Sequence, residues 1–228
     1  MRLIKRSALI ALLASGMLNL PLLAAAKPLG MVVTADSAHV GGTMKLAMGT
    51  NVFPGDYLDT DPGGTLRVKM GSTQIYLSSA SAAVLEQNAD TMGAKLTRGT
   101  LGFSSAQANE FEVHTPVATV RPAKGTAFGE VTLVGPHTIM VAAYRGSLLV
   151  SSNGMERVIP EGNSFNVSFA ADADPAGAGG GGNNPPQTGV HGVSNHGQIV
   201  FTAIVLGAAA GGAYAAWHYA TESNSNPQ

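Results

Sequence analysis

The residues of this chain that could do metal chemistry are few and scattered. Six histidines occur, but only His191 and His196 lie close together, and no third ligand follows at metal-site spacing. Three aspartates gather beside a Pro-Gly-Gly turn: Asp56, Asp59 and Asp61. They could hold a calcium ion, but aspartates in turns more commonly bond their own backbone. We therefore expect no metal and no cofactor.

Acid–base and nucleophilic chemistry has equally little support. Glu110 and Glu112 lie two residues apart on one predicted strand, so both point outward, as in a solvated charged row. The sequence contains no Gly-x-Ser-x-Gly elbow, phosphate loop or zinc-protease helix. We predict that the protein is not an enzyme. A deep pocket lined by His114, Glu112 and a third polar group would overturn that prediction.

A short pattern of a basic residue, a glycine, a hydroxyl residue and apolar residues occurs three times. The copies are Arg98-Gly99-Thr100-Leu101, Lys124-Gly125-Thr126-Ala127-Phe128 and Arg145-Gly146-Ser147-Leu148. We interpret each glycine as the corner of a repeated module. Stacked modules would bring Arg98, Lys124 and Arg145 to one edge, together with Arg121. Each long side chain then either bonds a carbonyl of its own turn or forms part of a stripe that meets an acidic partner.

The elements that position these residues are predicted to be short strands. Apolar and polar residues alternate with period two through most of residues 27–169, as in Leu66, Val68 and Met70, and glycine or proline interrupts them every eight to twelve residues. The pattern predicts an all-β domain with a bulge near Gly129. Sandwich, roll and solenoid all fit, and the repeated glycine corners favour a compact β-solenoid or roll.

The N-terminal residues 1–26 have the features of a secretory signal peptide. Three basic residues precede an uncharged apolar stretch, and Ala24-Ala25-Ala26 offers a cleavage site. An uncleaved signal anchor is the alternative. Cleavage would leave 10 basic against 14 acidic residues, a formal charge of −4, which disfavours nucleic acid as a partner. The chain contains no cysteine, so the domain must be stabilised by its core alone.

The C-terminal third changes composition twice. Residues 170–197 are rich in Gly, Pro and Asn and predict a flexible linker. Residues 198–220 are apolar and predict a helix, and 221–228 form a polar tail. Gly207 and Gly211 would give the helix a small-residue face for close packing, including self-assembly into a homo-oligomer. The helix could span a membrane or pack against another protein.

Residues from about Val32 to Val167 resemble the FecR family, envelope regulators of bacteria that sense iron-uptake signals. The matching segments, in order, are Pro54–Thr60 (PGDYLDT), Leu96–Leu101 (LTRGTL), His114–Pro116 (HTP) with Gly125–Phe128 (GTAF), Arg145–Val150 (RGSLLV) and Pro160–Gly162 (PEG). The resemblance implies a solenoid-like β-domain outside the inner membrane. Lys124 stands where the family usually has Arg. A predicted signal peptide also occupies the place of the family's cytoplasmic sigma-factor-binding segment.

Two functions follow as hypotheses for an exported protein of the periplasm or cell envelope, anchored by its C-terminal helix. In the first, the domain is a binding and sensing module that recognises another envelope protein. In the second, it is a structural scaffold that binds polysaccharide or peptidoglycan and assembles with its own copies through the C-terminal helix. Retention by cell-wall polymer without a protein partner would favour the second.

Overall fold

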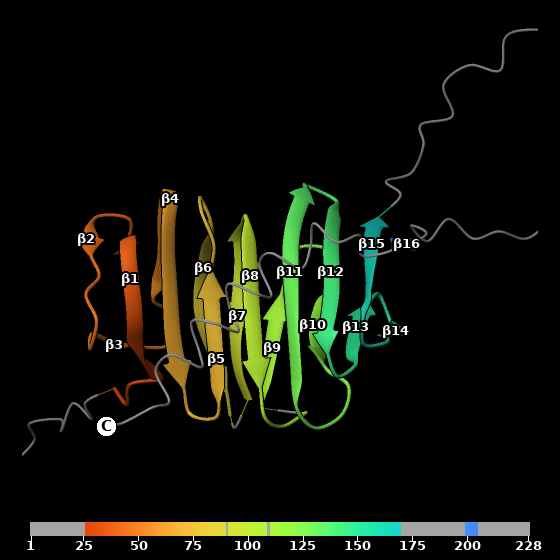
Figure 1. The fold of residues 1–228 in the computed structure, drawn as a ribbon, viewed down its shortest axis with the longest axis horizontal. Helices are drawn as coiled ribbons and strands as arrows, with labels where there is room; N and C mark the ends of the chain where they lie inside the picture. The colour runs from red at the N-terminus through yellow and green to blue at the C-terminus, as the bar shows by residue number, and fades with distance from the viewer. Residues whose placement is uncertain (1–25, 90, 109, 170–198, 205–228) are drawn as a thin grey trace, which may run out of the picture.

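All secondary structure that the structure describes is β-strand (Figure 1). The computed structural model describes residues 26–89, 91–108, 110–169 and 199–204. The strands are β1 (Gly30–Val40), β2 (Met44–Lys45), β3 (Asn51–Val52), β4 (Tyr57–Met70), β5 (Thr73–Leu77), β6 (Ala82–Asn88), β7 (Thr91–Arg98), β8 (Thr100–Ser105), β9 (Phe111–His114), β10 (Thr119–Pro122), β11 (Ala127–Gly135), β12 (Thr138–Arg145), β13 (Leu148–Ser152), β14 (Met155–Ile159), β15 (Asn163–Phe169) and β16 (Ile199–Ile204). The predicted all-β class is confirmed.

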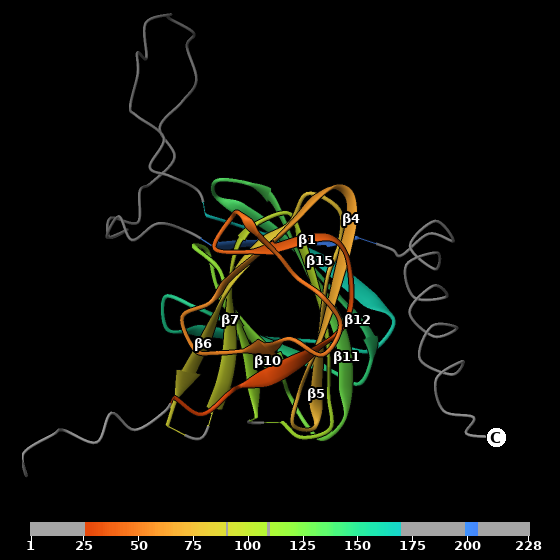
Figure 2. The ribbon, with the colours of Figure 1, turned by 90° about the vertical axis from the view of Figure 1, so that its left-hand side faces the viewer.

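These strands form one curled sheet with two arms. Arm A runs in the order β14-β13-β10-β9-β7-β6, arm B in the order β5-β8-β11-β12-β15-β16, and β4 joins them. The long β4 bends to do so: Tyr57–Asp59 pairs with β6, whereas Leu66–Met70 pairs with β5. Figure 2, seen down the long axis, shows β6, β7 and β10 opposite β5, β11 and β12. The solenoid or roll shape expected from the repeated corners stays a prediction.

The repeated glycines are the corners where the chain changes arms. Gly99 lies between β7 and β8, Gly125 between β10 and β11, and Gly146 between β12 and β13. All three have positive φ angles, of 74°, 50° and 68° respectively. An L-residue with a side chain adopts that conformation only at a cost, which explains why glycine recurs at the corners.

The core lies between the two arms and is made of the inward-facing half of each strand. Phe103 of arm B packs against Phe111 of arm A with ring centroids 5.5 Å apart, and both are fully buried. The expected bulge near Gly129 is confirmed, because the register of β11 against β12 shifts between Phe128 and Gly129. At the open side of the curl, Arg157 of β14 lies 4.8 Å from the ring centroid of Phe165 and 5.1 Å from that of Phe201. These cation–π contacts link the outer strands of the two arms.

The prediction of a helix over residues 198–220 is wrong for Ile199–Ile204. These residues form β16, which pairs antiparallel with β15. The sequence IVFTAI is rich in β-branched and aromatic residues, so it suits the edge of an existing sheet better than the Ala/Gly-rich sequence that follows. The described residues include no helix capable of crossing a membrane. The rest of the predicted helix, the linker 170–197, the tail and the signal peptide through residue 25 lie outside the described residues.

Candidate functional site

The structure places the four predicted basic residues at two opposite ends of the strands of the sheet. The backbone oxygen of Gly99 accepts a hydrogen bond from Leu133 N near the end of β11. Arg145 instead lies opposite Phe128, near the start of β11. Phe128 and Leu133 are five residue steps apart along β11, about 17 Å at the usual rise. Arg98 therefore does not join Lys124 and Arg145 at one edge. The strands β8 and β11 run antiparallel, so the corner before β8 and the corner before β11 lie at opposite ends of the pair.

Arg121, Lys124 and Arg145 do gather at one end, which we name the basic corner. Ala123 N donates to Ser147 O at 2.9 Å, so the turn after β10 lies against the turn before β13. Glu161 Oε2 accepts a hydrogen bond from Gly146 N at 3.0 Å, and Arg121 lies 3.9 Å from Glu156. Within the part of the chain that the structure describes, Lys124 and Arg145 are exposed and make no ion pair.

Arg98 bonds a backbone carbonyl, but that of a neighbouring turn and not of its own turn. Its Nε donates to Ala80 O at 3.0 Å and so ties the β7–β8 corner to the turn before β6. The same turn is held by Ser81 Oγ, which accepts a hydrogen bond from Thr100 N at 2.8 Å. The copy of the pattern at Gly99 thus has a structural role. The basic side chains of the other two copies, Lys124 and Arg145, are exposed at the opposite end.

A histidine and two aspartates meet where β1 pairs with β4. His39 is the register partner of Asp59, and its Nδ1 lies 3.9 Å from Asp61 Oδ2. One ligand atom from each of the three residues lies within 4.8 Å of the others, a spacing that a divalent cation could use. Asp56 is not part of this group, because its Oδ2 accepts a hydrogen bond from Phe53 N at 2.8 Å and so serves its own turn. Sequence reasoning missed His39, since 20 residues separate it from Asp59 and only strand pairing unites them.

His114 lies among carboxylates on the outer face of arm A. Its Nε2 is 3.6 Å from Glu112 and 3.9 Å from Glu86, and its Nδ1 is 3.2 Å from Thr119 Oγ1. These side chains are part-exposed on the surface of the sheet, so the arrangement is a charged row. Glu110 does not join it, because that carboxylate bonds Ser72 Oγ. The enzymatic alternative therefore gains no pocket here, and the absence of catalysis stays a prediction.

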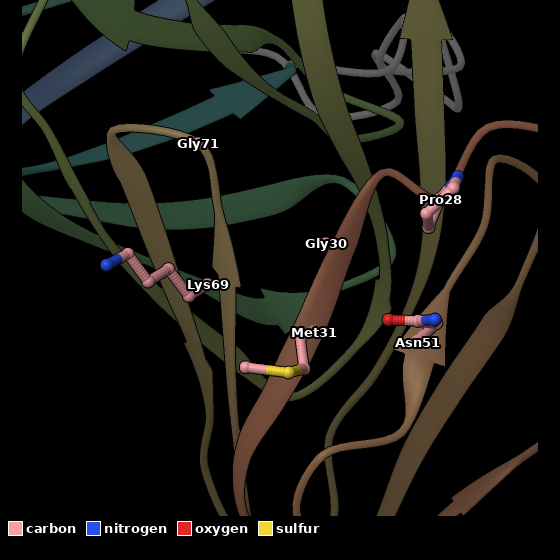
Figure 3. A pocket seen from close by; sticks show the side chains of 6 residues that line it. All are labelled: Pro28, Gly30, Met31, Asn51, Lys69 and Gly71. Carbon is pink, nitrogen blue, oxygen red and sulfur yellow. The ribbon is translucent and has the colours of Figure 1, made fainter.

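A shallow depression of about 330 Å³ lies beside β1, near β3 and the end of β4 (Figure 3). Its lining is mainly apolar or backbone and comes from Pro28, Gly30, Met31, Asn51, Lys69 and Gly71. Lys69 and Asn51 are the only residues of this set with polar side chains, and Figure 3 shows them on opposite sides of β1. The depression therefore lacks the converging polar groups expected of an active site.

Comparison with known families decides what kind of domain carries these features. Residues 56–149, from the turn before β4 into β13, match the family model described as FecR protein. These residues form a FecR domain. The resemblance inferred from the ordered motifs is thereby confirmed, and the match spans strands of both arms as well as Arg98, Lys124 and Arg145.

Comparisons with individual proteins add less. No curated protein matches the chain. Two crystal structures of a "putative anti-sigma factor" from Parabacteroides distasonis resemble it with a TM-score of 0.44 and 14% sequence identity. The alignment covers 64% of this chain and 58% of those chains, so this chain matches little more than half of their length.

Proposed function

We propose that this protein is a non-enzymatic binding and sensing module of the bacterial cell envelope, which recognises another envelope protein through its basic corner. The observation that carries the proposal is the state of Lys124 and Arg145. Both are exposed within the FecR domain and make no ion pair with any described residue. In the remaining copy of the pattern, Arg98 donates a hydrogen bond to a backbone carbonyl.

The basic corner suits an acidic protein surface for two physical reasons. Exposed cations that make no ion pair with the described residues lose little when they exchange water for a partner's carboxylates, and they speed encounter by electrostatic attraction. The corner also sits on a rigid base, because Gly146 N is bonded to Glu161 and Ala123 N to Ser147 O. Little ordering of the backbone is therefore needed on binding. A FecR domain that binds in this way would serve a regulatory role by reporting the presence of its partner.

The test uses the mature chain, Lys27 to Gln228, to capture partners from an envelope extract. The double variant Lys124→Gln/Arg145→Gln should fold with unchanged stability and lose at least about tenfold in affinity for the captured protein, the loss expected for two charge contacts. Arg98→Gln is the matched control: it removes one charge from the same pattern and should retain the partner while unfolding at a lower urea concentration.

Three results would refute the proposal. The first is capture of the same protein by the double variant with wild-type affinity. The second is an equal loss of capture in Arg98→Gln. The third is retention of the wild-type chain by peptidoglycan or polysaccharide with no protein partner. The last result would support the scaffold function. Added salt should weaken capture by the wild-type chain, because the contact is between exposed charges.

A further inference from the structure

The triad His39, Asp59 and Asp61 lies on the outer face of the sheet, where β1 pairs with β4 (Figure 1). Ala38 and Leu58 are fully buried, so the residues that follow them, His39 and Asp59, face away from the core. His39 and Asp59 are direct register partners. Asp61 comes two residues later on β4, and its Oδ2 lies 3.9 Å from His39 Nδ1. The pairing of two strands thus brings one imidazole and two carboxylates together.

The backbone that carries the two aspartates is held in place from β6 and the turn before it. Thr60, which lies between the aspartates, is 1% exposed, and its Oγ1 accepts a hydrogen bond from Ser81 N at 3.0 Å. The backbone oxygen of Asp61 accepts a hydrogen bond from Ala80 N at 3.1 Å. The two carboxylates therefore stand on a fixed strand and can bind a ligand without reorganising the backbone.

Asp59 carries a buried oxygen that has no partner. Its Oδ1 is removed from solvent and accepts no hydrogen bond from any described residue. Its neighbour on β6 is Ala82, whose methyl group is fully buried and cannot donate. A buried carboxylate oxygen that faces neither a donor nor a cation is unfavourable. This atom therefore points to a ligand that the described side chains do not supply.

The triad also carries an excess of negative charge. Two carboxylates stand against one imidazole, and the 3.9 Å contact between His39 and Asp61 is the one ion pair printed for the triad among the described residues. Lys45 of β2 is the register partner of His39 on its other side, but it is exposed and makes no ion pair with either aspartate. Such a site attracts a divalent cation.

The donor atoms suit zinc better than calcium or magnesium. Zinc accepts both imidazole nitrogen and carboxylate oxygen, whereas calcium and magnesium take oxygen ligands. Zinc bonds to nitrogen and oxygen are about 2.0–2.2 Å long, so two ligand atoms of a tetrahedral site lie about 3.4 Å apart. The 3.9 Å between His39 and Asp61 is longer by about 0.5 Å, a difference that rotation of the half-exposed Asp61 side chain can close.

We propose that His39, Asp59 and Asp61 bind one divalent transition cation of the zinc class. The cation supplies the missing partner of Asp59, and the exposed carboxylate of Asp61 gives it access from solvent. Both aspartates lie within the FecR domain and His39 precedes it, so the bound cation fastens β1 to the domain. The proposal departs from the sequence-based expectation of no metal, which did not include His39.

This site is separate from the basic corner, because β1 lies at the end of the sheet away from β13 (Figure 1). Loss of one therefore leaves the other testable. Zinc alone is the probe, titrated by calorimetry into the mature chain purified without a histidine tag. The wild type should bind one equivalent with micromolar or tighter affinity.

Three single variants identify the ligands. Asp59→Asn and Asp61→Asn should each weaken zinc binding at least about tenfold, since even the loss of an outer partner of a zinc ligand costs that much. Asp36→Asn is the matched control, because it removes an exposed carboxylate of β1 that lies outside the triad. It should bind zinc as the wild type does.

Stability separates a metal site from a carboxylate with a purely structural role. In metal-free buffer Asp59→Asn should unfold at a urea concentration no lower than the wild type, because its Oδ1 has no partner to lose. Added zinc should raise the urea midpoint of the wild type and of Asp36→Asn, and leave that of Asp59→Asn unchanged.

Four results would overturn the proposal. They are no zinc binding by the wild type, equal zinc affinity in Asp59→Asn, an equal loss of affinity in Asp36→Asn, and stabilisation by calcium but not by zinc. A lower urea midpoint of Asp59→Asn in metal-free buffer would overturn it as well, because that carboxylate would then already have a partner within the protein.

Discussion

Replacing Gly146 by alanine tests the role of the glycine corners, with Gly125 as a matched control. Both glycines have positive φ, 68° at Gly146 and 50° at Gly125, and both lie at the basic corner. A Cβ at Gly125 would meet no atom within 4 Å. A Cβ at Gly146 would collide with Thr126 O and lie 3.2 Å from Ala127 Cα and 3.3 Å from Ala127 Cβ.

The two substitutions should therefore differ in magnitude. Gly125→Ala costs only the left-handed conformation, about 1–2 kcal/mol. Gly146→Ala costs the same and adds about 1–3 kcal/mol of overpacking, because backbone atoms of the neighbouring turn must move. The gain from a less flexible unfolded chain is the same for both and cancels in the comparison. Gly146→Ala should thus be the less stable variant by roughly 1–3 kcal/mol.

Urea unfolding followed by far-ultraviolet circular dichroism measures this difference. The midpoint should fall further for Gly146→Ala, with an unchanged slope. Equal losses for the two variants would refute the argument that the corner is closed by direct contact between the β10–β11 and β12–β13 turns. A larger loss at Gly125 would refute it equally.

Two further predictions concern the core and the outer face of arm B. Phe103→Ala should lower the free energy of unfolding by about 3–5 kcal/mol, because the ring is fully buried against Phe111. Met155→Ala, at an exposed position, should change that free energy little. Similar urea midpoints for the two variants would place Phe103 outside the core. Glu130→Gln should stabilise the protein at neutral pH, because burial raises the pKa of Glu130 above its ordinary 4.5 and ionisation therefore opposes folding. The sign follows from proton binding, because the folded state holds the Glu130 proton to a higher pH than the unfolded state does. The wild type therefore loses stability as pH rises from the unfolded-state to the folded-state pKa of Glu130, by about 1.4 kcal/mol per unit of difference between the two. Below about pH 4 the difference in stability between variant and wild type should vanish. A gap independent of pH, in urea titrations from pH 3 to 8, would contradict it.

Local features of this fold could be predicted from the sequence, whereas pairings between distant strands could not. Gly99 and Gly146 are recognisable as corners because a positive φ is a property of one residue and its neighbours. The bulge at Gly129 follows from a shift of apolar phase within one strand. The separation of Arg98 from Lys124 depends instead on β8 and β11 running antiparallel, which the repeated pattern does not encode.

The same distinction explains the other differences. His39 joins Asp59 only through the pairing of β1 with β4, and no spacing in the sequence indicates it. The apolar run from residue 199 has a composition that suits a helix when counted as a whole. Its first six residues form a strand because β15 offers them an edge to pair with. Tertiary contacts override a local preference at that point.

The central claim, that an exported FecR domain recognises a protein through its basic corner, is tested most directly inside the cell. A photo-crosslinking amino acid is placed at Lys124 in one strain and at Arg98 in another, and the two are irradiated alike. We predict one discrete, heavier adduct from position 124, in the envelope fraction, and none from position 98. Equal adducts from both positions, or an adduct at neither while the protein remains in the cytosol, would contradict the account.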